Sequence, residues 1–257
     1  ISYPQINMRH PTAQLRQEMS CRYSNLRMAL IWFSILLVVG CLSIPKENIA
    51  ISQRDEALMF YVATPCDLTN EIQTPFVPQD SGAVLNKSGF RVAVWNILKG
   101  ARDGWQSDLK RLLEVNDLLV IQEARLSKEL QGLLRAQGFD WDMVEAFKLN
   151  GVPVGVLTAS NARASLVCTL KAKEPLLGTP KTALVTLYPF SGSNQRLMIV
   201  NLHLVNLTPG HSGFQNQLNR IDRIVSKHVG PVILAGDFNT WSDQRLSIVE
   251  TYTRRLG

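Results

Sequence analysis

The sequence predicts an α/β domain with helices between its strands and a sheet that is covered on both sides. Most strand-like runs are apolar at nearly every position, which is typical of strands that are buried on both faces. Helical periodicity recurs between these runs, at 104–115, 127–138 and 214–228. Of the 257 residues, 46% are hydrophobic and 19% are charged. This composition is that of a globular protein and excludes a disordered chain.

Regular elements begin at Phe90. We expect strands at 90–98 and 117–124, each followed by an amphipathic helix, at 104–115 and 127–138. Ser127 and Gly138 mark the start and end of the second helix, as an N-cap and a C-terminal glycine. The remaining strand-like runs are 142–149, 152–159, 164–170, 182–190 and 196–205, and a strand from Val232 follows the helix at 214–228. A last amphipathic helix is expected at 245–256.

The residues before this domain divide into three expected segments. Residues 1–28 are basic and lie upstream of, or outside, the translated protein. Residues 29–44 are apolar and uncharged, which is typical of a signal peptide or membrane anchor, although the run is shorter than the about 20 residues of a membrane span. A buried helix of the domain is the alternative. Residues 45–88 read as a linker, although 51–68 includes a run that can add a strand.

Charge and cysteine content narrow the function classes. The formal net charge of +6 and the pI near 9.3 suit a polyanionic partner such as nucleic acid. None of the four cysteines forms a C-x-x-C pair, which argues against a zinc ribbon or a thioredoxin-like site. Cys66 and Cys168 are candidates for a disulfide if the domain is exported. Two unrelated thiols are the equally weighted alternative.

Four buried strands end in polar residues that packing alone does not require. These residues are Asn96, Glu123, His203 and the pair Asp237 and Asn239. Each residue taken alone also has a purely structural explanation. Asn96 and the pair Asp237 and Asn239 can form turns, Glu123 can cap a helix or lie at the surface, and His203 can be a hydrogen-bonded histidine of the core. However, a buried carboxylate must be paired or must hold a metal, and such strand ends converge on one crevice in open α/β sheets. Residues two apart on a strand share a face, so we expect Asp237 and Asn239 to address one target.

These motifs together resemble one superfamily. The stretches "VAVWNI", "LLVIQEA", "VNLHL" and "GDFN" resemble the endonuclease/exonuclease/phosphatase superfamily, which includes deoxyribonuclease I, apurinic endonucleases, sphingomyelinases and inositol polyphosphate 5-phosphatases. The stretches "AGDFNTWSD", "PKTAL" and "VNLHLVNLTPG" are similar to an uncharacterised bacterial group within it. The resemblance implies a four-layer α/β sandwich, dependence on Mg²⁺ (or Mn²⁺), and phosphoester hydrolysis.

The resemblance also implies roles for the strand-end residues. Glu123 and Asn96 would hold the metal, and Asp237 would orient or deprotonate the attacking water. Asn239 would bond a phosphoryl oxygen, and His203 would donate to the charge that grows on the phosphate. Lys181 and Lys99 would contact the substrate's phosphate, with solvated surface lysines as the alternative. Trp95 and Trp241 flank the site and either stack on a base or pack at the sheet rim.

One departure from the superfamily concerns the end of the chain. Family members end with a further strand bearing Ser-Asp-His, and no such motif follows Asp237. We therefore expect the domain at 89–257 to be truncated, incomplete at its C-terminus and inactive by itself. The function would then belong to the intact gene product.

Three functional hypotheses follow. The leading one is a Mg²⁺-dependent phosphodiester hydrolase, a nuclease that acts on nucleic acid. The second is a lipid or inositol phosphate phosphatase or phosphodiesterase, and the third is an inactive fragment or binding module. We expect a monomer that associates with the bacterial inner membrane through 29–44 or lies in the periplasm, with the cytoplasm as the alternative.

Overall fold

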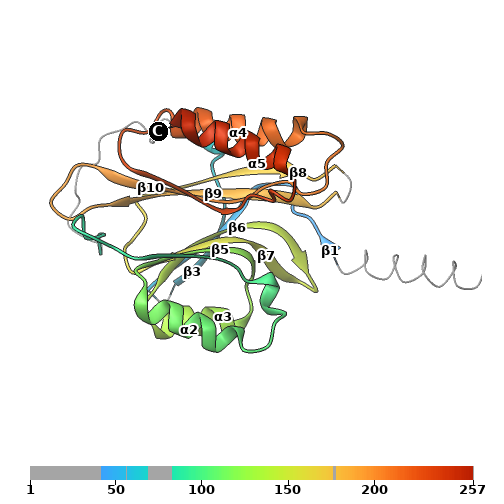
Figure 1. Ribbon diagram of the computed structural model, residues 1–257. Helices are drawn as coiled ribbons and strands as arrows, with labels where there is room; N and C mark the ends of the chain where they lie inside the picture. The colour runs from blue at the N-terminus through green and yellow to red at the C-terminus, as the bar shows by residue number, and fades with distance from the viewer. Residues whose placement is uncertain (1–41, 56, 69–82, 176–177, 257) are drawn as a thin grey trace, which may run out of the picture. The chain divides into compact units, whose positions relative to one another are not determined.

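Two β-sheets form the centre of the fold in the computed structural model (Figure 1). The structure describes residues 42–55, 57–68, 83–175 and 178–256. Apart from the short strand β1 (Leu42–Ser43), every element below lies in the unit formed by residues 43–257. The helices and strands expected from Phe90 onward are all formed, with bounds shifted by a few residues.

The first sheet has the strand order β3-β2-β6-β7-β5-β4. Its strands are β2 (Ile49–Arg54), β3 (Ala57–Val62), β4 (Val92–Asn96), β5 (Leu118–Arg125), β6 (Asp140–Leu149) and β7 (Val152–Ser160). Strands β4 and β5 are parallel, and the other neighbours are antiparallel. Helices α2 (Trp105–Val115) and α3 (Lys128–Ala136) pack against this sheet through one apolar core that includes Leu109, Leu130 and Ile121.

The second sheet has the order β11-β10-β9-β8. Its strands are β8 (Leu166–Lys173), β9 (Pro180–Pro189), β10 (Arg196–His203) and β11 (Val232–Asp237), of which β10 and β11 are parallel. Helices α4 (Ser212–Val225) and α5 (Asp243–Leu256) lie over one face of this sheet (Figure 1). Phe214 and Ile221 of α4 share a core with Val200 and Leu202 of β10.

The two sheets pack against each other through their helix-free faces. Leu118 and Val120 of β5 lie in one apolar cluster with Leu197 and Ile199 of β10. A strand in this position is buried on both faces, because one face meets helices and the other meets the second sheet. The mixed α/β architecture with two sheets agrees with the sandwich that the superfamily resemblance implies. The apolar pattern of a run such as β10 indicates only that both faces of the strand are covered, because the pattern is the same whether helices or a second sheet cover them.

The expected linker at 45–88 contains two strands of the first sheet. Ala50 and Ile51 of β2 are fully buried, and β2 is hydrogen-bonded to β6 as well as to β3. Strand β3 is the edge strand, and all six of its residues are exposed. After β3, the 3₁₀-helix η1 (Cys66–Leu68) brings Cys66 to Cys168 of β8, and the two form a disulfide.

The remaining N-terminal expectations fall mostly outside the described residues. This holds for the basic segment 1–28 and for all but the last three residues of the apolar segment 29–44. Among the helices that the structure describes, none is long and apolar enough to cross a membrane.

Candidate functional site

The polar ends of strands from both sheets meet at one place. Asn96 ends β4 of the first sheet, and Asp237 ends β11 of the second. The amide Nδ2 of Asn96 donates to Oδ2 of Asp237 at 2.9 Å, so this bond joins the two sheets. Oδ1 of Asn96 accepts from the backbone N–H of Leu98 at 3.0 Å, which fixes the orientation of the amide.

Asp237 and Asn239 do not share a strand face. Strand β11 ends at Asp237, and Asn239 has a φ of +50°, in the left-handed region. The backbone N–H of Asn239 donates to Oδ1 of Asp237 at 2.9 Å, and its side-chain amide donates to the carbonyl of Leu204 at 2.7 Å. The expectation of a shared face was wrong, because the chain turns directly after Asp237. Asn239 fixes the turn and the Asp237 carboxylate.

His203 lies between Lys181 and Asp237. Strands β10 and β11 place His203 beside Asp237 in register, with Nε2 3.6 Å from Oδ2. On its other side, Nε2 lies 2.8 Å from Nζ of Lys181 on β9. An ammonium has no acceptor lone pair, so a protonated Lys181 donates to Nε2, and a neutral His203 ring that accepts this bond carries its proton on Nδ1.

Burial governs the protonation of both partners. His203 is only 8% exposed, and this burial together with the nearby Lys181 charge lowers the pKa of His203 to about 4, against the opposing charges of Asp237 and Glu123. Burial also lowers the pKa of Lys181 below its ordinary value, which Glu174, Glu123 and Asp237 partly offset. At neutral pH the imidazole is therefore uncharged, and the positive charge of this pair resides on Lys181.

Glu123 is directed by an irregularity in β5. The pairing of β5 with β7 shifts register between Ile121 and Ala124, and Glu123 has a φ of +51°. Such a β-bulge re-aims a side chain at the edge of a sheet. The Glu123 carboxylate accepts from the ammonium of Lys99. Although burial disfavours its charged form, this bond and the Lys99 charge hold the pKa of Glu123 below its ordinary value.

A cavity of about 240 Å³ opens beside these residues. Its polar lining includes Lys99, Glu123, Lys181 and His203, and its apolar lining includes Phe147 and Val154. The cavity thus combines two ammonium groups with a small apolar wall. This chemistry suits an anionic group that carries an organic substituent.

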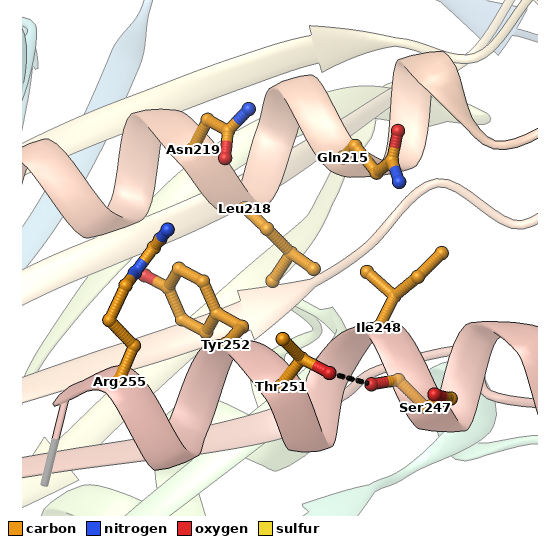
Figure 2. Close-up of a pocket in the computed structure, with 8 residues that line it drawn as sticks. All are labelled: Gln215, Leu218, Asn219, Ser247, Ile248, Thr251, Tyr252 and Arg255. Carbon is orange, nitrogen blue, oxygen red and sulfur yellow. Dashed lines mark hydrogen bonds between the residues drawn. The ribbon is translucent and has the colours of Figure 1, made fainter.

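A larger groove of about 510 Å³ lies elsewhere, between α4 and α5. Figure 2 shows that Leu218, Ile248 and Tyr252 face this groove, with Gln215, Asn219 and Arg255 around it. No carboxylate or histidine lines it. The groove therefore lacks the groups that hydrolysis of a phosphoester requires, and the strand-end site is the candidate active site.

The arrangement of these residues agrees with the sequence relationships of the chain. Residues 93–253 match the Endonuclease/Exonuclease/phosphatase family. The chain belongs to this family. The matched range begins in β4 and reaches α5, so it includes every strand end that contributes to the site.

Relatives within this family are bacterial proteins. A UPF0294 protein of Photorhabdus laumondii is 38% identical over 180 residues, which cover 70% of this chain and 69% of the relative. A UPF0294 protein of Yersinia pseudotuberculosis is 42% identical over 167 residues, which cover 65% of this chain and 64% of the relative. These matches confirm the resemblance to an uncharacterised bacterial group. The chain thus spans about two thirds of the length of these relatives.

A solved structure shares the fold. A functionally unknown conserved protein from Enterococcus faecalis V583 superposes with a TM-score of 0.51 at 21% identity, over 63% of this chain and 71% of that chain. Mixed α/β architecture with two sheets is therefore common to both proteins.

The donor groups at the site fit a hard divalent cation. Within the described ranges, no three His, Cys, Asp or Glu side chains gather into a metal-binding cluster. A Mg²⁺ site does not require such a cluster, because Mg²⁺ is usually held by one or two carboxylates together with waters and substrate phosphates. The Glu123 carboxylate already contacts a cation, the Lys99 ammonium, and Oδ1 of Asn96 is a second hard oxygen. These two residues fit the predicted Mg²⁺ site.

Two residues that support the site were not predicted from the sequence. Glu174 follows β8, is fully buried and lies 3.9 Å from Lys181. Arg245 is 1% exposed and donates to the carbonyls of Val205 and Asn239, thereby joining the loops after β10 and β11. Glu174 occurs in a polar stretch that is typical of a surface loop, and Arg245 is the charged first residue of the helix expected at 245–256, so the sequence does not indicate that either is buried.

Proposed function

We propose that the intact gene product is a Mg²⁺-dependent phosphodiester hydrolase built on the four-layer α/β sandwich of its superfamily, and that it cleaves nucleic acid. The observation that carries the proposal is the meeting of Asn96, His203 and Asp237 at the ends of strands from both sheets. Glu123 and Lys181 line the adjoining cavity. Family membership supports phosphoester chemistry at this place.

Asp237 acts on the attacking water. Oδ1 of Asp237 is held by the backbone of Asn239, and Oδ2 is held by the amide of Asn96. Both groups donate a hydrogen bond to the carboxylate. Each carboxylate oxygen keeps a further lone pair, which can accept a hydrogen bond from a water molecule. A carboxylate oriented in this way can position and deprotonate water for attack on phosphorus.

Lys181 supplies the positive charge that faces the phosphoryl group. The sequence predicted His203 as the donor; in this proposal Lys181 donates instead, because burial favours a neutral His203 ring whose Nε2 lies within hydrogen-bond distance of Lys181. His203 therefore positions the ammonium. A preorganised cation in a partly desolvated site stabilises the charge that develops on the transferred phosphoryl oxygens.

Glu123 and Asn96 hold the metal in this proposal. When bound, Mg²⁺ supplies further positive charge to the phosphoryl oxygens. Lys99 neutralises Glu123 in the structure, and its ammonium lines the same cavity as that of Lys181. These contacts support a role for Lys99 in binding a substrate phosphate.

An exposed aromatic ring favours nucleic acid as the substrate. Trp241 lies four residues after Asp237 and is 65% exposed. The guanidinium of Arg245 lies 4.9 Å from the centre of its ring, which restrains an otherwise exposed side chain. Aromatic rings held beside a phosphodiester site bind unstacked bases.

Two exposed aliphatic residues favour a lipid phosphoester as the second candidate. Leu98 follows β4 and is 42% exposed, and Leu207 follows β10 and is 41% exposed. Both lie on the loops that carry site residues. Aliphatic side chains at this rim suit an acyl chain better than a base.

A substrate panel separates the two candidates. With Mg²⁺, we expect the intact gene product to cleave single-stranded DNA or RNA in preference to phosphoinositide vesicles. We expect Trp241→Ala to raise the KM for nucleic acid roughly tenfold, because stacking on one base contributes about 1–3 kcal/mol. Cleavage of an abasic oligonucleotide, which has no base to stack, should remain unchanged. Cleavage of the vesicle lipid alone would establish the second candidate instead.

A further inference from the structure

Glu174 is a buried carboxylate in the turn between β8 and β9. It has no solvent exposure. Its Oε1 accepts from the backbone N–H of Asn206 at 2.9 Å and from that of Leu207. These two amides belong to the loop that follows β10, three and four residues after His203. One oxygen of Glu174 thus fixes the loop that leaves the site.

The second oxygen of Glu174 faces Lys181. Oε2 is buried and has no hydrogen-bond partner in the described part of the chain, and it lies 3.9 Å from Nζ of Lys181. Nζ of Lys181 lies in turn 2.8 Å from Nε2 of His203. Lys181 is therefore held between a buried carboxylate and the imidazole of the site. An ionised carboxylate without exposure is costly unless a cation balances it.

The charges around Lys181 come from every element that packs against it. Glu174 faces it from the β8–β9 turn, Glu123 from β5, Asp237 from β11, and the cation Lys99 from the 3₁₀-helix η2 (Leu98–Gly100). His203 contributes a neutral ring from β10. Burial lowers the pKa of Lys181, and Glu174 is the largest contribution that raises it again. Glu123 and Asp237 have further partners in Lys99 and Asn96, whereas Oε2 of Glu174 faces Lys181.

We propose that Glu174 is a positioning residue that holds Lys181 as an ammonium against His203, so that Lys181 can donate to the phosphoryl group. Glu174 reaches neither the substrate cavity nor the reacting atoms, because its carboxylate is buried behind Lys181. Its effect on hydrolysis passes through Lys181. This role in hydrolysis rests on the proposed function, whereas the effect on the protonation of Lys181 does not.

The first test measures the protonation of Lys181 directly. Glu174→Gln keeps the size of the side chain and the oxygen that caps Asn206, but it removes the charge. Reaction of Lys181 with acetic anhydride, followed by mass spectrometry across a pH series, reports the free amine. We expect labelling of Lys181 near pH 8 to rise roughly tenfold in Glu174→Gln, since one pKa unit changes the free-amine fraction tenfold.

A matched control is available on β6. Glu145 is also buried, at 2% exposure, but its nearby cations are Lys148 and Lys171. We expect Glu145→Gln to leave the labelling of Lys181 unchanged. Glu174→Asp keeps the charge and should label more like the wild type than Glu174→Gln does. Equal labelling of Lys181 in the wild type and Glu174→Gln would overturn the proposal.

The second test is kinetic and uses the same variants on bis(p-nitrophenyl) phosphate with Mg²⁺. We expect Glu174→Gln to lower kcat roughly tenfold with little change in KM, and to move the alkaline limb of the pH profile to lower pH. In a Lys181→Met background, Glu174→Gln should not lower kcat any further. A loss that persists in that background would assign Glu174 to the loop alone and would overturn the proposal.

The two tests separate failure of this proposal from failure of the proposed function. A protein that hydrolyses no phosphodiester contradicts the proposed function, and the labelling result still decides the role of Glu174. If Glu174→Gln does not fold, the melting temperature (Tm) of Lys181→Met decides instead. A lower Tm is expected, because a buried carboxylate then loses its cation, and an unchanged Tm would overturn the pairing.

Discussion

The imidazole of His203 receives a hydrogen bond from an ammonium while a carboxylate lies 3.6 Å away. In water such a ring would take up a proton below pH 6.5. Here burial and Lys181 prevent this, and the pKa falls to about 4. At the scale of single residues, the site thus keeps its charge on Lys181 and uses His203 as a neutral acceptor.

This protonation predicts how stability depends on pH. Above pH 6.5, His203 is neutral in both the folded and the unfolded chain and contributes nothing to the dependence. As the pH falls from 6.5 towards 4, the unfolded chain binds a proton that the folded chain does not bind. The free energy of unfolding should therefore decrease over this window, by roughly 3 kcal/mol. Urea unfolding at several pH values measures the decrease.

The variant His203→Gln is the control for this prediction. Glutamine can accept from Lys181 but does not titrate, so the decrease between pH 6.5 and 4 should be smaller in this variant. NMR titration of the His203 ring gives the pKa itself. A midpoint near 6.5 would show that Lys181 does not donate to a neutral ring.

At the scale of elements, the site residues lie where regular structure is interrupted. Among the described residues, six that are not glycine have a positive φ, and four of these are Leu98, Lys99, Glu123 and Asn239. A left-handed conformation costs a residue with a side chain on the order of 1 kcal/mol. The cost is concentrated in the loops and the bulge that direct polar side chains into the site.

These interruptions mark the limit of what the sequence could predict. Period-two and helical patterns correctly predict the strands and helices after Phe90, and they place Asn96, Glu123, His203 and Asp237 at strand ends. The bulge at Glu123 and the turn at Asn239 leave no pattern, because only the local backbone changes. The run at 51–68 was expected to add one strand to a linker but contains most of β2 and all of β3, and the buried polar residues Ser52 and Gln53 interrupt the apolar pattern of β2.

Gly236 is the residue that allows β11 to lie against β10 immediately before Asp237. Its φ is +140°, and a Cβ at this position would lie 2.0 Å from the carbonyl oxygen of Leu202. We predict that Gly236→Ala moves β11 away from β10 and lowers the free energy of unfolding by about 2–4 kcal/mol. Because His203 and Asp237 are paired across these strands, hydrolysis should fall as well. Chemical unfolding and the Mg²⁺-dependent assay measure both effects.

Gly132 provides the matched control on helix α3. Apart from its chain neighbours and the backbone of its own helix, no atom of the described residues lies within 4 Å of a Cβ built at Gly132. Gly132→Ala should therefore stabilise the protein by about 0.5–1 kcal/mol, as alanine does in a helix interior. If Gly236→Ala proved as stable as Gly132→Ala, the close approach of β10 and β11 would be refuted.

At the scale of the whole molecule, the site depends on the packing of two sheets. The bond between Asn96 and Asp237 crosses from one sheet to the other. The apolar clusters between the sheets keep the ends of these two strands next to each other. The disulfide between Cys66 and Cys168 adds a covalent link between η1 and β8. Apolar patterns indicated that the strand ends converge, but only the superfamily resemblance implied two sheets, because the pattern of a strand does not show whether helices or a second sheet cover it.

The most direct test compares the wild-type protein with Asp237→Asn in the hydrolysis of bis(p-nitrophenyl) phosphate, with Mg²⁺ and after its removal by EDTA. Asparagine preserves the shape and can still accept from the backbone N–H of Asn239, but it cannot take a proton from water. We predict Mg²⁺-dependent turnover by the wild type and a loss of at least about 100-fold in Asp237→Asn, which should still fold but with a lower Tm, because the bond from the Asn96 amide is lost. Equal turnover by the two proteins, or turnover that EDTA does not affect, would contradict a metal-dependent phosphodiesterase centred on Asp237.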